Sequence, residues 1–222
     1  MPRRPAARRP PVPATRPSVP AQVRTCVAGP VDTGVALGRQ NAGMPSRVLA
    51  VQLSPVHEFS KGPVVEIELV EGYGVRGDAH AGTTVQHRSR VAKDPTSPNL
   101  RQVHLLHAEL LDDLAGLGHT VHPGDLGENV TTTGIDLLGL SRGARLALGE
   151  AEVEVTGLRN PCYQIDDFQP GLLRQVLRRH GDGAVERLTG VMAVVTRGGT
   201  VRPGDHIRVT APDGPLVALT PV

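Results

Sequence analysis

One cysteine in this chain stands among residues that would make it reactive. Cys162 follows Arg159, Asn160 and a proline, in a segment that comes directly after a predicted strand ending at residue 157. An arginine close to a thiol favours the thiolate, the form of cysteine that attacks electrophiles and binds soft metals. A buried, unreactive cysteine is the ordinary alternative for a residue of this type. The segment therefore predicts that any chemistry centres on one thiol.

Two glycine-rich loops carry most of the other polar candidates. They cover residues 74–82 and 123–129, and each lies next to a predicted strand. Such loops present backbone and side-chain donors and acceptors to a ligand. In a purely structural interpretation, the polar side chains of the second loop only close turns. The candidates in the two loops are Arg76, Gly77, Asp78, His80, Gly127, Glu128 and Asn129.

Two familiar site types are disfavoured. Residues 72–77 read GYGVRG and match the dinucleotide fingerprint, but that fingerprint needs a helix to begin inside the glycines. The next residues, DAHAG, predict a loop instead. Histidine-bound zinc is disfavoured because His80 and His87 should lie too far apart on an extended loop to hold one ion.

Composition excludes several classes of protein. A length of 222 residues allows one domain with a tail, and two cysteines cannot build a disulfide framework or an all-cysteine metal site. Two Tyr, two Phe and no Trp leave an aliphatic core and too few rings to stack nucleic-acid bases. No apolar run reaches the roughly 18 residues that a membrane helix needs. We expect no nucleic-acid or membrane partner and a reducing, cytoplasmic setting.

Residues 1–46 differ from the rest of the chain. They hold seven arginines and one acid, a charge of +6, so the remainder is −4 because the whole chain is +2. Nine of the 20 prolines also lie there, without apolar periodicity, which predicts a disordered tail. The segment is either a nonspecific basic arm or an over-called start, with Met44 as the true first residue.

From residue 47 onward, short β-rich runs alternate with Gly, Pro, Asn and Asp. We expect a mainly β domain over residues 47–210, built as a closed or half-closed barrel with two or three short peripheral helices, and a C-terminal tail over 211–222. The expected helices are 108–117 and 170–179. The expected strands are 47–53, 64–70, 103–106, 128–132, 145–148, 152–157, 191–196 and 206–210.

Taken in order, these segments resemble the MOSC domain, which ends eukaryotic molybdenum-cofactor sulfurases and also occurs as stand-alone bacterial proteins. The resemblance covers about residues 48–209, and the sequence VLAV after Met44 looks like a family N-terminus. It rests on GVRGDAHAG (74–82), RQVHL (101–105), PGDLGENVT (123–131), RNPC (159–162) and GGTVRPGDHI (198–207). It implies a mostly β, barrel-like fold in which Cys162 binds molybdenum of the pterin cofactor or carries sulfur as a persulfide.

The resemblance also suggests roles for other residues. Arg76, Arg101, Arg159 and glycine-loop amides, including that of Gly77, would bind the phosphate or nucleotide of the molybdenum cofactor (molybdopterin). Glu128 and Asn129, with Gly127 and Asn160 beside them, would bond the pterin edges. Asp78 or His80 would orient the site or move a proton.

Three functions remain open from the sequence. In the first, the protein binds molybdenum cofactor and reduces N-hydroxylated substrates, with electrons from a separate flavin or iron–sulfur protein, or acts with cofactor-maturation enzymes. The second is a non-catalytic sulfur carrier or cofactor chaperone. The third is a structural β-barrel with an inert cysteine.

Overall fold

The computed structural model describes residues 45–222, so the predicted disordered segment up to residue 44 lies outside the described residues. The domain is mainly β with a few short helices, which confirms the expected class. Four helices occur within residues 45–222, not two or three. None of the helices in this part of the chain has the length and apolar character to cross a membrane.

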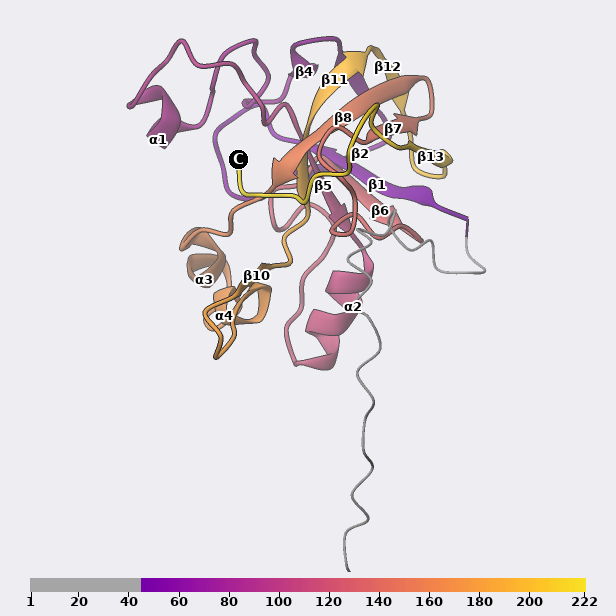
Figure 1. Ribbon diagram of the computed structural model, residues 1–222. Coiled ribbons are helices and arrows are strands. Elements are labelled where there is room, and N and C mark those ends of the chain that lie inside the picture. The colour runs from indigo at the N-terminus through magenta and orange to yellow at the C-terminus, as the bar shows by residue number, and fades with distance from the viewer. Residues whose placement is uncertain (1–44) are drawn as a thin grey trace, which may run out of the picture. The chain divides into compact units, whose positions relative to one another are not determined.

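The main sheet contains eight strands (Figure 1). All neighbouring pairs are antiparallel except β5 and β6, which are parallel. In spatial order the strands are β13 (Ile207–Thr210), β7 (Arg145–Leu148), β8 (Ala151–Leu158), β11 (Val191–Arg197), β5 (Val103–His107), β6 (Val130–Thr133), β1 (Arg47–Leu53) and β2 (Gly62–Val64).

Alternating side chains explain how these strands build the core. In β8, Val153 and Val155 are buried while Glu152 and Glu154 are only half-buried, as a pleated strand with one apolar face requires. The buried residues of the core around this sheet are all Val, Ile, Leu or Ala. The aliphatic core expected from the composition is therefore confirmed for the main sheet.

A second, smaller core lies beneath the helices. Leu106 of β5 packs with Leu110 and Leu114 of α2 (Glu109–Gly116), with Ile165 of α3 (Gln164–Phe168) and with Val176 of α4 (Leu173–Val176). In Figure 1 these three helices lie on the same side of the sheet. The remaining elements are α1 (Arg88–Val91), the pair β9 (Leu177–Arg179) and β10 (Val185–Arg187), and the sheet of β12 (Gly199–Val201), β3 (Ile67–Val70) and β4 (Gly74–Val75).

Two predicted elements are wrong in extent. The helix expected over 170–179 exists only as α4, because residues 177–179 form β9 and pair with β10 across a turn that contains two glycines. The strand expected over 64–70 is split at Val65, whose side chain is 85% exposed. Its two parts, β2 and β3, belong to different sheets, so an alternation of apolar residues that looked continuous in the sequence belongs to two separate strands.

Strand pairing in residues 45–222 does not close the main sheet into a barrel. An isolated bridge nevertheless joins Arg47 of β1 to His206, the residue before β13. The backbone N–H of Val48 also donates to the carbonyl of Asp205 at 2.9 Å. The two regions therefore touch although their strands lie far apart in the sheet order.

Residues 211–222, expected only as a C-terminal tail, bond to the main sheet. Leu158 N–H donates to the carbonyl of Thr220 at 2.9 Å, and a bridge links Leu158 to Pro221. The side chain of Arg101 donates to the carbonyl of Val222 at 3.3 Å. This segment therefore ends beside a residue that the sequence identified as a site candidate.

Gly190, just before β11, occupies a position that only glycine fits. Its φ is +76°, and a Cβ there would overlap the backbone oxygen of Leu105 in β5. Its carbonyl accepts from the N–H of Arg159 at 3.0 Å. Glycine is therefore needed where β5, β11 and the end of β8 meet.

Gly190→Ala is expected to destabilise the protein by about 1–3 kcal/mol more than Gly118→Ala. Gly118 also has a positive φ, of +86°, but no heavy atom lies within 4 Å of a Cβ built there, so it isolates the backbone strain. Urea unfolding of both variants gives the comparison. Equal losses would show that the close approach of Gly190 to β5 has no energetic consequence.

Candidate functional site

A cavity of about 620 Å³ collects most of the residues singled out from the sequence. Its walls come from the loop before β2, the 80–93 segment, the start of β5, the 126–129 loop and the segment after β8. The predicted residues that line it are His80, Arg101, Gly127, Asn129, Arg159, Asn160 and Cys162. Residues up to about 80 positions apart in the chain thus share one cavity.

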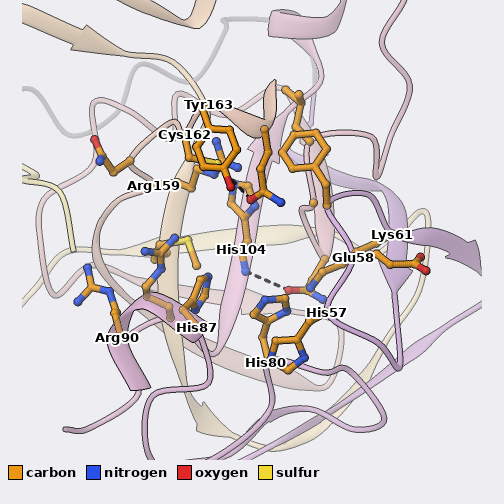
Figure 2. Close-up of a pocket in the computed structure, with 18 of the residues that line it drawn as sticks. His57, Glu58, Lys61, His80, His87, Arg90, His104, Arg159, Cys162 and Tyr163 are labelled. Atoms are coloured by element: carbon orange, nitrogen blue, oxygen red, sulfur yellow. Dashed lines mark hydrogen bonds between the residues drawn. The ribbon is translucent and has the colours of Figure 1, made fainter. Parts of the chain in front are cut away.

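Cys162 lies at one end of this group of side chains. Figure 2 shows it beside Arg159 and Tyr163, with His57 and His80 toward the other end and His104 between. The thiol is half-buried, and its Sγ donates to the side-chain oxygen of Gln164 at 3.5 Å. The side chain is thus partly accessible within the cavity rather than enclosed in a core.

Two arginines of the cavity, Arg159 buried and Arg101 half-buried, have no Asp or Glu partner within residues 45–222. Arg159 is 7% exposed, and no hydrogen-bond partner for its Nη1 occurs within residues 45–222. The Nε of Arg101 likewise lacks a partner in the described part of the chain, although its Nη1 reaches the carbonyl of Val222. A buried charged group left unpaired is costly, so this arrangement favours an anion that binds from the cavity.

The electrostatics of the two arginines agree with that geometry. Burial, together with the positive charges of Arg159 and Arg90, lowers the pKa of Arg101 to about 10. Burial also lowers the pKa of Arg159, although the nearby groups Cys162 and Glu128 act to raise it. These like charges repel each other in a site of low dielectric, and a negative ligand would reduce that repulsion.

Asp78 does not line the cavity but holds three side chains that do. Its carboxylate pairs with Lys61 Nζ at 2.7 Å and accepts from Asn129 Nδ2 at 3.0 Å. It also accepts from the backbone N–H of His80 at 2.9 Å, with the His80 ring Nδ1 at 3.3 Å. Burial opposes the charge of Asp78, but the bonds from His80 and the charge of Lys61 outweigh it and hold the pKa of this carboxyl well below its ordinary value.

His104 is a second fixed group in the cavity wall. Its Nε2 lies 2.7 Å from the carbonyl of Thr189, whose hydroxyl in turn donates to the carbonyl of Arg159 at 3.3 Å. Burial, followed by the charge of Arg159, lowers the pKa of His104 to about 3. The imidazole is therefore neutral at pH 7 and helps to position the chain at Arg159.

The expectation that His80 and His87 stay apart is wrong. Their ring centroids are 4.6 Å apart, and His57 lies 5.0 Å from His80 on the other side. The loop is folded back on itself, because Asn99 donates to the carbonyls of His80 and Gly82 at 3.0 Å. Within residues 45–222, however, no three His, Cys, Asp or Glu side chains are arranged to hold one metal ion.

Besides Asp78, three predicted residues lie outside the cavity lining. Arg76 is exposed and pairs with Glu68, its Nε 2.6 Å from Oε2, and Gly77 belongs to the same turn. Glu128 is fully buried and accepts from the N–H of Gly124 at 2.6 Å, so it holds the 123–129 loop closed. Burial raises the pKa of Glu128.

Sequence reasoning missed several lining residues. Lys61 stands beside a short strand without a polar motif, and its role depends on Asp78, which is 17 positions away. The other lining residues that were not predicted as ligand contacts are His57, Glu58, Phe59, His87, Arg90, Lys93, His104, Leu126, Tyr163, Gln164 and Met192. Tyr163 and Gln164 adjoin the motif of Cys162, and His104 and Leu126 lie inside the motifs at 101–105 and 123–131, so for these four residues the motifs were a usable signal.

The chain belongs to the MOSC domain family. The family model, described as the MOSC domain, matches residues 82–208, which confirms the resemblance stated from the sequence. This range contains the thiol, Arg101, Arg159 and most of the cavity wall.

Solved structures share the fold. The YuaD protein from Bacillus subtilis is 24% identical with a TM-score of 0.61, and the match covers 75% of this chain and 96% of that one. YiiM from Geobacillus stearothermophilus is 16% identical with a TM-score of 0.52, covering 75% of each chain. YiiM from Escherichia coli is 20% identical with a TM-score of 0.52, covering 78% of this chain and 73% of that one. No curated protein matches in sequence.

Removing the charge of Asp78 should destabilise the domain. Asp78→Asn is expected to lower the free energy of unfolding by about 3 kcal/mol, because Lys61 keeps a buried charge without its counter-charge. Urea unfolding measures the loss. The double variant Asp78→Asn with Lys61→Met removes both charges and should recover much of it. A double variant as unstable as the single one would contradict this account.

Stability should also fall on mild acidification. Folded His104 stays neutral down to about pH 3, whereas the unfolded histidine takes up a proton near pH 6.5, so acid favours the unfolded state. Between pH 7 and pH 5 this one residue should cost about 2 kcal/mol. His104→Gln keeps an amide donor for the carbonyl of Thr189 but does not titrate. Between pH 7 and pH 5, the unfolding free energy of this variant should therefore fall by about that amount less than that of the unaltered protein. Parallel pH curves for the two proteins would contradict the assignment.

Proposed function

We propose that this MOSC protein binds the molybdenum cofactor in the cavity, with Cys162 as the molybdenum ligand or as a carrier of sulfur. The observation that carries the proposal is that Arg101 and Arg159 each have a buried nitrogen with no partner within residues 45–222, in the same cavity as the half-buried thiol. The MOSC family is associated with this cofactor.

The residues present fit such a group. Its phosphate is anionic, and a guanidinium binds phosphate through paired N–H donors. Of the three less exposed cations of the cavity, Lys61, Arg101 and Arg159, only Lys61 pairs with an Asp or Glu in the described part of the chain, so the two arginines supply uncompensated charge. The thiolate of Cys162 is a soft ligand suited to a molybdenum–sulfur centre.

The structure refines the roles proposed for other residues. The side-chain amide of Asn129 already donates to Asp78 and accepts from the N–H of His104, so we assign it to holding the cavity wall. His80 turns Nδ1 toward Asp78, which leaves Nε2 to hold or move a proton at a ligand. Arg76 and Gly77 lie outside the lining, so we assign them no contact with the phosphate.

The bound cofactor would supply two-electron redox chemistry, which the side chains of this protein cannot. Reduction of N-hydroxylated substrates would then need electrons from a separate flavin or iron–sulfur protein. Two cysteines are too few for a cluster of this chain's own. Within the cavity, Arg159 would hold negative charge near Cys162 and His80 would provide protons.

A half-buried thiol also suits the second candidate, a persulfide carrier or cofactor chaperone that works with cofactor-maturation enzymes. A gain of one sulfur atom on Cys162, without reduction of an N-hydroxylated substrate when a reductase partner is present, would favour it. Mass spectrometry of the intact chain detects that gain.

We further propose that the main sheet is a half-closed barrel. The bridge between Arg47 and His206 supports this, as does the bond from the N–H of Ile207 to the carbonyl of Ser46 at 2.9 Å. These contacts bring β1 to the start of β13. The gap between the two strands farther along would remain open.

Metal content tests the proposed function. Protein made in a host that synthesises molybdenum cofactor should contain molybdenum, and Cys162→Ala should lose nearly all of it if the thiol is the ligand. Cys26→Ala is the matched control, because it removes the other cysteine and should leave the content unchanged. Molybdenum absent from the unaltered protein, or equal in all three, would contradict the thiolate-bound cofactor.

A further inference from the structure

Asn99 uses its whole side-chain amide to connect two residues of the cavity. It is 3% exposed and does not itself line the cavity. Its Nδ2 donates to the carbonyls of His80 and Gly82, both at 3.0 Å, and its Oδ1 accepts from the N–H of Arg101 at 3.0 Å. An asparagine amide has two N–H donors and one oxygen, so every polar group of this side chain is in use. One buried residue therefore bonds to the backbones of both His80 and Arg101.

Backbone pairing holds the loop that follows residue 82. The N–H of Asn99 donates to the carbonyl of Thr83 at 3.0 Å, and the N–H of Val85 donates to the carbonyl of Ser97 at 3.0 Å. These two bonds do not involve the side chain of Asn99, so they remain when it is substituted. The side chain is thus what extends the contacts of the loop to the chain just before β5.

The chain around Arg101 is in turn fixed to the main sheet. The hydroxyl of Thr156 in β8 donates to the carbonyl of Leu100 at 2.7 Å. The guanidinium of Arg101 forms one hydrogen bond among the described residues, through Nη1. A long side chain with a single bond depends on its backbone for its position. Asn99 therefore ties the loop at residues 80–82 to a segment that the sheet holds.

Asn99 and Asp78 hold the peptide groups of His80 from both ends. Asp78 accepts from the N–H of His80 at 2.9 Å, and Asn99 donates to its carbonyl at 3.0 Å. The His80 ring lies next to those of His57 and His87, with centroids 5.0 and 4.6 Å away (Figure 2). A buried polar network in which every member is bonded specifies one arrangement. Loss of the Asn99 amide would release one of the two ends.

We infer that Asn99 is a positioning residue, which fixes His80 and Arg101 relative to one another in the cavity. In the proposed function His80 holds a proton and Arg101 binds an anion, and a displacement of about 1 Å can cost about a hundredfold in rate. As far as the cofactor is concerned, the inference rests on the proposed function. Its prediction for a simple anion does not, because that needs only the Nε of Arg101, which has no partner among the described residues.

Two substitutions separate the two connections. Asn99→Ala removes all three side-chain bonds. Asn99→Ser removes the amide donors to the loop, but its hydroxyl can still accept from the N–H of Arg101, because serine closes the same kind of turn two residues on. The serine variant should therefore release the loop while Arg101 stays in place.

Two measurements follow the two ends. Isothermal titration calorimetry with inorganic phosphate, on the full chain made free of cofactor, reports on Arg101. Asn99→Ala should weaken phosphate binding by about threefold to tenfold, the cost of ordering one long side chain on binding, and Asn99→Ser should leave it nearly unchanged. Amide hydrogen exchange reports on the loop. The hydrogen-bonded N–H groups of Ala81 and Gly82 should exchange at least about tenfold faster in both variants, because two bonds that hold the loop are lost.

Gln102→Ala is the matched control for loss of stability. Gln102 is 6% exposed, lies outside the cavity lining and bonds to the carbonyl of Gly72 and the N–H of Val195, both at 2.9 Å. Its substitution should lower the free energy of unfolding in urea about as much as Asn99→Ala, while phosphate affinity stays unchanged. Arg101→Gln shows where phosphate binds and should weaken it at least as much as Asn99→Ala.

Phosphate affinity that is unchanged in Asn99→Ala or in Arg101→Gln overturns the inference. Equal weakening in Gln102→Ala, or no phosphate binding by the unaltered protein, overturns it too. If Asn99→Ala does not fold, Asn99→Ser decides alone, and weaker phosphate binding or unchanged exchange in that variant overturns the inference.

Molybdenum content separates this inference from the proposed function. Unaltered protein from a host that synthesises the cofactor should contain more molybdenum than Asn99→Ala from the same host. Equal contents contradict only the inference. Molybdenum absent from the unaltered protein, together with the expected phosphate and exchange results, contradicts only the cofactor proposal.

Discussion

Asp78 accepts hydrogen bonds from side chains on three separate parts of the chain, Lys61, His80 and Asn129, and each of the three lines the cavity. The carboxylate itself is almost completely buried, so it can keep its charge only while these donors stay in place. The reverse also holds, because Lys61 is buried and has no other carboxylate partner in the described residues. The wall of the cavity is therefore fixed by mutual dependence. A shift of any one loop would leave a buried charge unpaired, which costs about 3–5 kcal/mol, the order of magnitude known for buried ion pairs.

In the part of the cavity wall that contains Arg159, the charge is not neutralised by the described fold. Arg159 is held through its backbone, by the carbonyl of Gly190 and the hydroxyl of Thr189, while its guanidinium has an unpartnered nitrogen. His104 bonds to the same Thr189, so a neutral imidazole and a fixed peptide position a charge that the protein does not neutralise. One wall thus has its charge satisfied within the fold, and the other has it available to a ligand. Because the charge of Arg159 is not neutralised within the described fold, this is the side of the cavity where an anion would bind.

The two aliphatic cores also affect which residues line the cavity. The buried members of both cores include no aromatic residue, although Phe59 packs against the second core, and two of the four aromatic residues, Phe59 and Tyr163, line the cavity. The thiol of Cys162 lies beside Arg159 and Tyr163, in a half-buried position that a partner or a ligand can reach. The MOSC family membership gives this arrangement a chemical context.

The sequence by itself determined the elements whose evidence is local. The β-rich runs gave the strands at 47–53 and 145–148 with their observed bounds. The glycine-rich loops and the cysteine segment identified six residues of the cavity lining, and the family resemblance added Arg101. Only the tertiary structure decided the contacts between distant residues. It paired Lys61 with Asp78, brought His80 against His87 and turned residues 177–179 into a strand. It also left Nη1 of Arg159 without a hydrogen-bond partner among the described residues. The physical reason is that hydrophobic alternation is read along a few neighbouring residues, whereas charge satisfaction, burial and strand pairing depend on whichever residues the fold brings close.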